Sequence, residues 1–385
     1  MRERCVLRRF SSPAGETRGD SARSGGHVQY EPTTGSAAME GQGAYNQHAK
    51  LQAGGAALAL PLLEEATQKI PLDDQDQRIV VADYGSSQGK NSLAPVGIAI
   101  KTFRRRFGPD RAILVFHVDQ PENDFNSLFE VVGSDPSSYV SGEPNVFPCA
   151  IGRSFYKQVL PHQSVHLGWS SYAVVWLSQV PAKIPGHFVV VRSSGSVRAA
   201  FDRQGAQDWE AFLTLRANEL RPGGRLVVVL PALNDDERWG FEELFDHANS
   251  LLSEMVDQGT LGADERERMV LGTFYRRRCD LLAPFQREGK FQDLTVEACE
   301  VSLLADAAWT DYQHHRNKEM LAAQHAMFFR ATFMPSLASA LRDPGDAERR
   351  HAFARDLEAG LKRLLAQQPV PVHSYVTTIV LAKHR

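Results

Sequence analysis

The chain has 385 residues, of which 43% are hydrophobic and 23% are charged, and its formal net charge is −3. These values are ordinary for a globular protein, and the lack of a basic excess argues against a general binder of nucleic acids or membrane surfaces. The four cysteines are scattered and form no CxxC pair, so the sequence predicts neither a zinc site nor a disulfide framework, and a cytoplasmic location is expected.

The first elements in chain order are a tail and a β-α-β unit. Residues 1–38 are rich in Arg, Gly, Ser and Pro without apolar periodicity, so we expect a disordered tail before a single domain that covers 39–385. The pattern of residues 54–70 predicts a helix. A buried strand over 78–85 then leads through a glycine turn into a second helical segment, and residues 112–119 form another apolar strand.

The rest of the chain predicts further strands and a helical region. Near-continuous apolar runs are typical of a parallel sheet that is covered on both faces, and they recur at residues 147–152, 164–171 and 225–230. Residues 235–341 have mainly helical patterns, and we expect them to form a cap insertion over the sheet. A strong strand pattern over 373–383 predicts a last strand at the far end of the sheet. The fold class is therefore α/β.

The segment ADYGSSQGKN is the strongest chemical signal. Asp83 ends the first strand, Gly85 and Gly89 flank a tight turn, and Asn91 opens the next helix. The glycines let backbone N–H groups approach a ligand, but their spacing matches neither the GxGxxG turn of dinucleotide sites nor a P-loop. Asp119, at the end of the second strand, is placed to accept hydrogen bonds from ribose hydroxyls. The pattern indicates a nucleoside cofactor; a packing turn without ligand, with Asp119 as a helix cap, is the alternative.

Four separated segments resemble, in the right order, sequence blocks of the SABATH family of methyltransferases. This family includes salicylate, benzoate and jasmonate carboxyl methyltransferases and the N-methyltransferases of the caffeine pathway. The four segments are ADYGSSQGKN, FHVDQPENDFNSLF, RSFYKQVLP and SVHLGWSSYAVVWLSQVP. With GAYNQHAKLQ and RATFMPSLASAL, the resemblance covers residues 41–385. It implies a class I Rossmann-like methyltransferase sheet with a helical cap, and S-adenosylmethionine (SAM) as the cofactor.

The resemblance also implies which residues bind the cofactor. Asp119 would bind the ribose, because a carboxylate suits two vicinal hydroxyls, while Ser154 would hold the adenine and Phe155 would cover it. Ser86 and Gln120 stand where the family usually has a cysteine and an apolar residue. The implied cofactor-binding residues are Tyr45, Asp83, Gly85, Ser86, Asn91, Asp119, Gln120, Ser154 and Phe155.

On the acceptor side, the resemblance implies two catalytic residues. Gln52 matches a glutamine whose amide donates to the substrate carboxylate, and Trp176 matches a tryptophan whose indole N–H supports it. Neither adds a full charge, so the carboxylate oxygen stays nucleophilic. A carboxylate with a pKa near ~4 is ionised at neutral pH and needs no general base, so we expect catalysis by proximity and orientation. The implied substrate-binding residues are Gln52, Val175, Trp176, Phe245 and Tyr275.

Three arginines, Arg276, Arg277 and Arg278, directly follow Tyr275. We interpret them as a solvated helix face. The alternative is a positively charged mouth that draws an anionic acceptor into the pocket.

The predicted function is methyl transfer from SAM to the carboxylate of a small, aromatic or apolar acid, which gives a methyl ester and S-adenosylhomocysteine (SAH). N-methylation of a small heterocycle is the alternative within the family. From other classes, the alternatives are a nicotinamide-dependent oxidoreductase, although GxGxxG is absent, and a non-catalytic ligand-binding descendant. We expect a homodimer by resemblance and no metal. Neither a nucleic acid nor a membrane is expected as a partner, since no apolar run reaches the ~20 residues of a membrane span.

Overall fold

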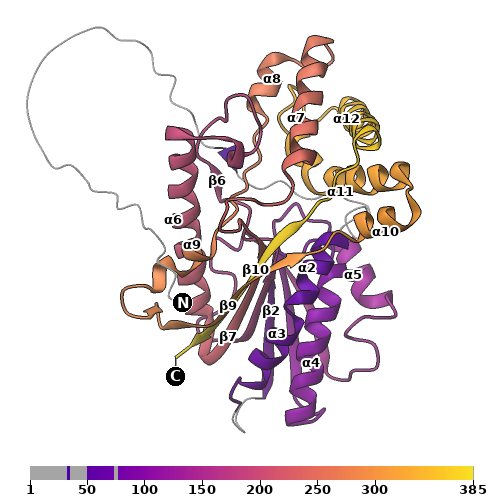
Figure 1. Cartoon of the computed structure of the whole chain (residues 1–385). Helices are drawn as coiled ribbons and strands as arrows, with labels where there is room; N and C mark the ends of the chain where they lie inside the picture. Colours follow the sequence, from indigo (N-terminus) through magenta and orange to yellow (C-terminus); the bar gives the residue numbers. More distant parts are fainter. Residues whose placement is uncertain (1–32, 35–49, 73–76, 385) are drawn as a thin grey trace, which may run out of the picture.

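The fold is built around one large sheet in the computed structural model of the chain (Figure 1). The structure describes residues 33–34, 50–72 and 77–384. Within these residues, eight strands form the large sheet in the order β4-β3-β2-β5-β7-β10-β9-β8, and β1 and β6 form a second, two-stranded sheet. The strands are β1 (Thr33–Thr34), β2 (Arg78–Tyr84), β3 (Ala112–Asp119), β4 (Val146–Gly152), β5 (Val165–Ser171), β6 (Gln179–Val180), β7 (Leu220–Pro231), β8 (Lys290–Phe291), β9 (Leu294–Leu304) and β10 (Ser374–Lys383).

The parallel half of the sheet runs from β4 to β7, and β2 lies at its centre. Only the first residue of β2, Arg78, is exposed, in keeping with the apolar run that predicted this strand. Along the chain, β3 and β4 are added on one side of β2, and β5 and β7 on the other. The direction in which strands are added therefore reverses between β2 and β5. This position is the topological switch point, beside which open α/β sheets bind their ligands. The predicted α/β fold class is confirmed.

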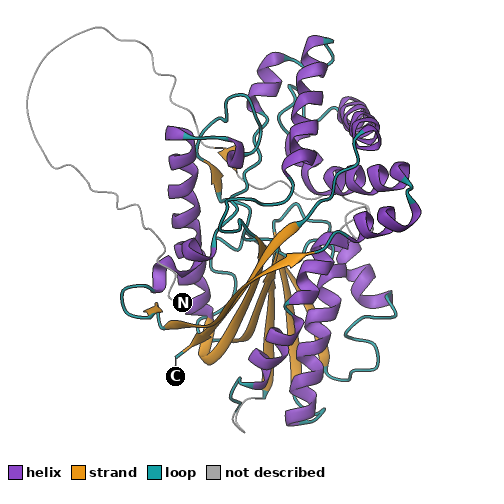
Figure 2. Cartoon of the chain, viewed as in Figure 1, coloured by secondary structure: helices purple, strands orange, loops and turns teal. Residues whose placement is uncertain are grey.

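Helices cover both faces of the sheet (Figure 2). Alternate residues of β2 point to opposite faces, so Val81 joins a core with α2 to α5, while Val80 joins a core with Trp209 and Phe212 of α6. The helices on the first face are α2 (Lys50–Leu58), α3 (Leu60–Gln68), α4 (Leu93–Phe107) and α5 (Phe125–Ser134). Those on the second face are α6 (Gly195–Glu219), α9 (Arg278–Leu282) and the 3-10 turn η3 (Ala283–Phe285). Two further 3-10 turns are η1 (Lys90–Ser92) and η2 (Val190–Arg192).

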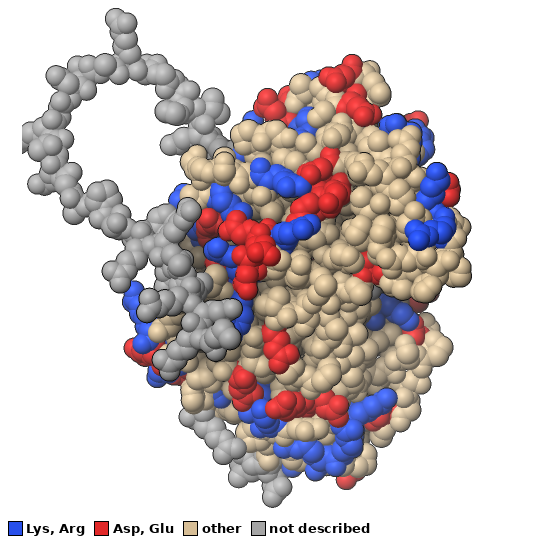
Figure 3. All heavy atoms as spheres, in the orientation of Figure 1, with Lys and Arg blue, Asp and Glu red and all other residues tan. Residues whose placement is uncertain are grey.

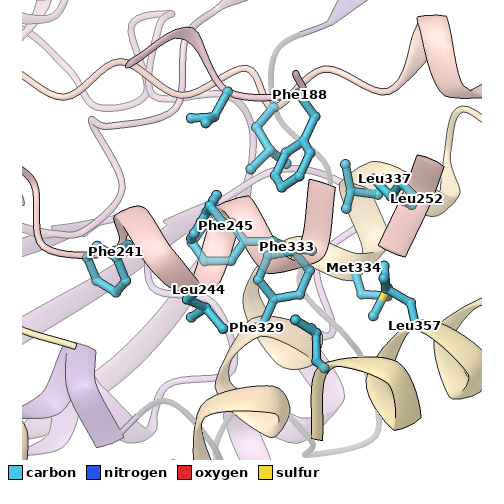
Figure 4. Packing of buried hydrophobic residues seen from close by; sticks show 14 of the residues in the cluster. Phe188, Phe241, Leu244, Phe245, Leu252, Phe329, Phe333, Met334, Leu337 and Leu357 are labelled. Atoms are coloured by element: carbon cyan, nitrogen blue, oxygen red, sulfur yellow. The ribbon is translucent and has the colours of Figure 1, made fainter. Parts of the chain in front are cut away.

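A third group of helices forms a cap with its own apolar core. Phe188, Phe245, Phe329 and Phe333 pack together there with aliphatic residues such as Leu357, as Figure 4 shows. Their rings meet edge to face, stacked or tilted, with centroids 4.9 to 6.2 Å apart. The cap helices are α7 (Glu242–Asp257), α8 (Ala263–Arg268), α10 (Ala307–His315), α11 (Lys318–Ala338) and α12 (Ala347–Gln367). Because this core is closely packed, the cap is a preformed layer of helices over the sheet rather than a loosely packed insertion.

The expected cap boundaries, 235–341, differ from the structure in two respects. The segment contains β8 and β9, which extend the sheet, and α12 lies beyond its end. Most residues of β9 are only half buried or exposed, because it lies near the edge of the sheet. Its apolar pattern is interrupted by Glu297 and Glu300, so it lacks the continuous apolar character of a buried strand.

Two other elements also depart from expectation. β10 does not lie at the end of the sheet, because it pairs with β7 on one side and β9 on the other, antiparallel to both. The single helix expected over 54–70 is two helices that meet at Ala59, and the first begins earlier, at Lys50. Pro61 lies in the first turn of the second helix, where its missing N–H breaks no helical hydrogen bond.

The visible face of the molecule carries charges of both signs (Figure 3). Basic and acidic side chains are intermingled there. Exposed ion pairs among the described residues include Asp264 with Arg268 at 2.9 Å and with Arg342 at 2.7 Å. This face shows no field of a single sign of the kind that attracts nucleic acids. Among residues 33–34, 50–72 and 77–384, no helix is both long and apolar enough to cross a bilayer.

Candidate functional site

A cavity opens at the carboxyl ends of the parallel strands, below the cap, and its empty space, together with the solvent at its mouth, is about 860 Å³. One wall comes from the turns that follow the strands, and the other from α2, α11 and extended segments near the cap. Of the predicted site residues, those on its wall are Gln52, Gly85, Asp119, Gln120, Phe155, Val175, Trp176 and Tyr275. The cavity therefore brings together, at the switch point, residues from both predicted halves of the site.

The glycine turn after β2 is held against the end of β3. Gly85 has a φ of +90°, and a Cβ there would lie 2.1 Å from the Cβ of Ala173, so no larger residue fits. The Asp119 carboxylate accepts a hydrogen bond from the Ser87 N–H at 2.6 Å and one from the Gln120 N–H at 2.8 Å. Because each carboxylate oxygen can accept more than one hydrogen bond, Asp119 keeps acceptor capacity toward the cavity.

The electrostatic state of Asp119 follows from this setting. Burial raises the pKa of its carboxyl to about 6, although the N–H donors of Ser87 and Gln120 act to lower it. The nearby charge of Asp83 adds to the increase. Asp119 is therefore a desolvated acceptor at the cavity wall, ready for donors such as vicinal ribose hydroxyls.

Asp83, in contrast, lies behind the cavity wall. Its carboxylate is buried and accepts hydrogen bonds from the Ser92 hydroxyl and from Nδ1 of His117, the latter at 3.0 Å. His117 Nε2 lies 2.8 Å from the hydroxyl of Tyr139. This buried chain fixes the end of β2 and the start of the next helix. A direct contact of Asp83 with the cofactor stays a prediction.

Four other predicted cofactor residues do not lie on the cavity wall or are not described by the structure. The Ser86 hydroxyl is buried and has no hydrogen-bond partner among the described residues. Asn91 is half buried in η1, and the Ser154 hydroxyl accepts from the Tyr156 N–H at 3.2 Å. Tyr45 lies outside the described residues. Their proposed contacts with the cofactor are not tested by this geometry.

Phe155 is positioned by a buried ion pair at the end of α6. Arg216 and Glu219 are both fully buried, with their charged atoms 3.0 Å apart. Arg216 donates to the carbonyl of Phe155 at 2.9 Å, and Glu219 accepts from the Val159 N–H at 2.7 Å and the Tyr84 hydroxyl at 2.8 Å. The pair therefore anchors the loop that places the Phe155 ring on the cavity wall.

The end of the cavity where the sequence predicts the acceptor, called the acceptor end here, is lined by aromatic rings and neutral polar groups. Gln52 and Trp176 both face it, and the Gln52 amide Nε2 donates to Thr332 Oγ1 at 3.1 Å. Thr273 pairs with Trp176 in an isolated antiparallel bridge, which puts their side chains on the same side. The residues at this end that were not predicted are Leu51, Phe241, Thr273, Phe328, Thr332 and Phe333. Thr332 and Phe333 lie within the RATFMPSLASAL segment, and the resemblance of this segment to the family is the sequence feature that could have identified them.

Phe245, predicted to line the acceptor pocket, does not lie on the described cavity wall. It is fully buried in the cap core, where its ring stacks on Phe188 with centroids 5.6 Å apart and meets Phe333 edge to face at 4.9 Å. Figure 4 shows it among these rings. Phe333 is itself on the wall, so Phe245 supports the pocket from behind.

The first arginine after Tyr275 does not lie on a solvated helix face, as the sequence had led us to expect. Arg276 is buried and donates to the carbonyls of Val174 at 2.7 Å and Gly205 at 2.8 Å. It is therefore neither a solvated helix residue nor part of a charged pocket mouth. Its guanidinium ties the segment that carries Trp176 to α6. Arg277 pairs with Asp280 at 3.0 Å at the start of α9.

The residues present fit a nucleoside cofactor. The Asp119 carboxylate, the glycine turn that a Cβ would fill, and the Phe155 ring lie on one side of the cavity. In the described parts of the chain, no three His, Cys, Asp or Glu side chains are grouped so that they could hold a metal ion.

The comparisons with known proteins concern the fold, the family and the cofactor. The solved structure titled loganic acid methyltransferase with SAH matches 90% of this chain and 99% of its own, with a TM-score of 0.71 and 22% identity. The fold is therefore that of the class I SAM-dependent methyltransferases. A profile for SAM-dependent carboxyl methyltransferases matches residues 34–382, so the chain belongs to this family, the SABATH family. SAM is its methyl donor, and the family, fold class and cofactor predicted from the sequence are confirmed.

Individual relatives differ in the reactions that their names describe. Methyltransferase LUC1 from Fusarium sp is 36% identical over 245 residues, which are 62% of this chain and 62% of that protein, just under two thirds of its length. Salicylate carboxymethyltransferase from Clarkia breweri is 27% identical over 277 residues, 68% of this chain and 75% of that one. Probable caffeine synthase MTL2 from Coffea canephora is 26% identical over 335 residues, 78% and 86% of the two chains. The acceptor of this chain must therefore be inferred from its own cavity.

Proposed function

We propose that this methyltransferase acts on the carboxylate of a small aromatic or apolar acid and produces its methyl ester. The observation that carries the proposal is the acceptor end of the cavity, where the Gln52 amide and the Trp176 indole lie among aromatic rings such as Phe241 and Phe333. An apolar pocket with a few neutral donors favours a molecule with an apolar body and one anionic end. The name of the Clarkia breweri relative describes methylation of such an acid.

The reaction places few demands on the protein. Bound SAM supplies a methyl group on a sulfonium, and its transfer to a carboxylate oxygen breaks the C–S bond and forms the ester bond. The carboxylate is already ionised near neutral pH, so no residue has to remove a proton. The Gln52 and Trp176 donors would orient the acceptor oxygen, and the cap would exclude water. Phe155 and Asp119 would hold the adenine and ribose of the cofactor at the other end.

N-methylation of a small heterocycle is the second candidate, and one observation favours it. The Gln52 Oε1 atom is buried and has no hydrogen-bond partner among the described residues, so it could accept from an N–H of the acceptor. The name of the Coffea canephora relative describes chemistry of this kind. We further propose, from the sequence alone, a cytoplasmic homodimer with one methyltransferase domain over residues 39–385. The tail expected over residues 1–38 lies outside the described residues, except for Thr33 and Thr34, which form β1.

Replacing Gln52 with leucine tests the role of the amide. The Gln52→Leu variant is expected to lower kcat/KM for the acid by about 10- to 100-fold, because a hydrogen bond to a charged group contributes about 1.5–3 kcal/mol. Affinity for SAH, measured by calorimetry, should not change, since Gln52 faces the acceptor. Gln258→Leu, at an exposed position, is the matched control. Equal turnover of Gln52→Leu and the wild type would refute the assignment.

A further inference from the structure

A contact across the acceptor end joins two distant parts of the chain. Gln52, on α2, and Thr332, on α11, are 4% and 8% exposed, and both lie on the cavity wall. The Gln52 Nε2 donates to the Thr332 Oγ1 at 3.1 Å. The hydrogen bond therefore links the helix before the sheet to a helix of the cap, directly beside the place of the acceptor.

The opposite atom of the same amide is unsatisfied. Gln52 Oε1 is buried and has no hydrogen-bond partner among the residues that the structure describes. A buried polar atom without a partner costs about 1–3 kcal/mol, so it is a site that a ligand can satisfy. An anionic acceptor, however, would be repelled by a carbonyl oxygen and needs the amide NH₂ instead.

The Thr332 hydroxyl can pair with either end of the Gln52 amide. A hydroxyl donates one hydrogen bond and accepts others, whereas a carbonyl oxygen only accepts and an NH₂ group only donates. If the Gln52 amide rotates by about 180° so that its oxygen and nitrogen exchange places, the Thr332 hydroxyl can donate to Oε1. The NH₂ group then points to the acceptor. A valine at 332 has the same shape as threonine but can hold neither arrangement.

We propose that Thr332 is a positioning and specificity residue that determines which end of the Gln52 amide the acceptor meets. For a carboxylate acceptor, its hydroxyl holds the Oε1 atom, so that the NH₂ group donates to the acceptor. For an acceptor with an N–H, the same hydroxyl holds the NH₂ group and leaves Oε1 to accept. The inference rests on the proposed function, because it assigns Thr332 a part in the orientation of the same acceptor.

The test is a double-mutant cycle on Thr332 and Gln52. Thr332→Val, Thr332→Ser, Gln52→Leu and the double variant Thr332→Val/Gln52→Leu are assayed with labelled SAM and with benzoate, salicylate, phenylacetate and hexanoate. We expect Thr332→Val to raise KM for the best acid by about tenfold, equivalent to one lost hydrogen bond, with a smaller change in kcat and none in SAH affinity. Thr332→Ser, which keeps the hydroxyl, should restore the wild-type KM. In the Gln52→Leu background, Thr332→Val should have no further effect.

Three outcomes would overturn the inference. The first is a Thr332→Val variant with the wild-type KM, and the second is an effect that persists when Gln52 is leucine, since Thr332 would then act only through packing. The third is a Thr332→Ser variant that is as impaired as Thr332→Val. If the wild type methylates none of the four acids, the proposed function fails and this inference falls with it. That result is distinct from an active wild type without coupling between the two positions.

Discussion

The Asp119→Asn variant should bind SAH about 100-fold more weakly than the wild type, or worse. The carboxylate already holds the turn through the Ser87 and Gln120 N–H groups, and it offers its remaining lone pairs to the cavity. Asparagine has one acceptor oxygen, so one of these N–H groups loses its partner and a ribose hydroxyl meets an NH₂ group instead. The ribose loses a hydrogen bond to a charged group, which contributes about 1.5–3 kcal/mol, and meets a buried donor instead, so the total loss is about 3 kcal/mol, which calorimetry with SAH would measure directly.

The same residue gives the binding a pH dependence. The pKa of Asp119 is about 6 in the absence of ligand, and the ribose hydroxyls require the ionised form. Affinity for SAH is therefore complete well above pH 6 and decreases as the pH falls through that value, by up to about tenfold per unit. Asp119→Asn should lose this dependence, while Asp356→Asn, at an exposed position, should keep it. Wild-type affinity that does not change between pH 5 and 7 would contradict the ribose assignment.

The Glu219→Ala variant should be the most strongly destabilised of the simple substitutions. It leaves the Arg216 guanidinium buried without its carboxylate, and it removes the acceptor of Tyr84 and Val159. Breaking one side of a buried ion pair costs about 3–5 kcal/mol. In thermal unfolding, this loss corresponds to a decrease in Tm on the order of 4–7 °C for a chain of this length.

An exposed ion pair offers the matched control for this prediction. Glu254 lies 3.5 Å from Arg363, with both side chains about half exposed, so Glu254→Ala should change the stability by less than about 1 kcal/mol. Because the Arg216 and Glu219 pair also anchors the loop of Phe155, Glu219→Ala should weaken SAH binding as well. A Glu219→Ala variant with the Tm of Glu254→Ala would show that the pair does not hold this loop.

The strands β2, β5, β7 and β10 could be predicted from sequence because most of their residues are buried, which gives them near-continuous apolar runs. β3 has the predicted bounds, and β2 and β10 differ from them by one residue. β9 could not be predicted in this way, because a strand near the edge is half exposed and includes Glu297 and Glu300. The order of β10 and β9 depends on long-range pairing, which no local pattern contains.

The site was predicted best where the sequence blocks resemble those of the family. Asp119, Phe155 and Trp176 lie within such blocks, and all three reach the cavity. Phe245 was assigned from an approximate alignment in the cap, and packing places it in the core instead. The burial of Arg276 was missed for another reason. Its hydrogen-bond partners are backbone carbonyls, which every residue has, so no sequence pattern identifies them.

The most direct measurement is methyl transfer from SAM labelled on its methyl group to small carboxylic acids and neutral N-heterocycles. Methyl esters are cleaved by mild alkali, whereas N-methyl products are not, so alkali treatment separates the two proposed functions. We predict an alkali-labile product with at least one aromatic or apolar acid, and its slower formation by the Gln52→Leu variant. An alkali-stable product from the heterocycles, with none from the acids, would contradict the carboxyl methyltransferase proposal.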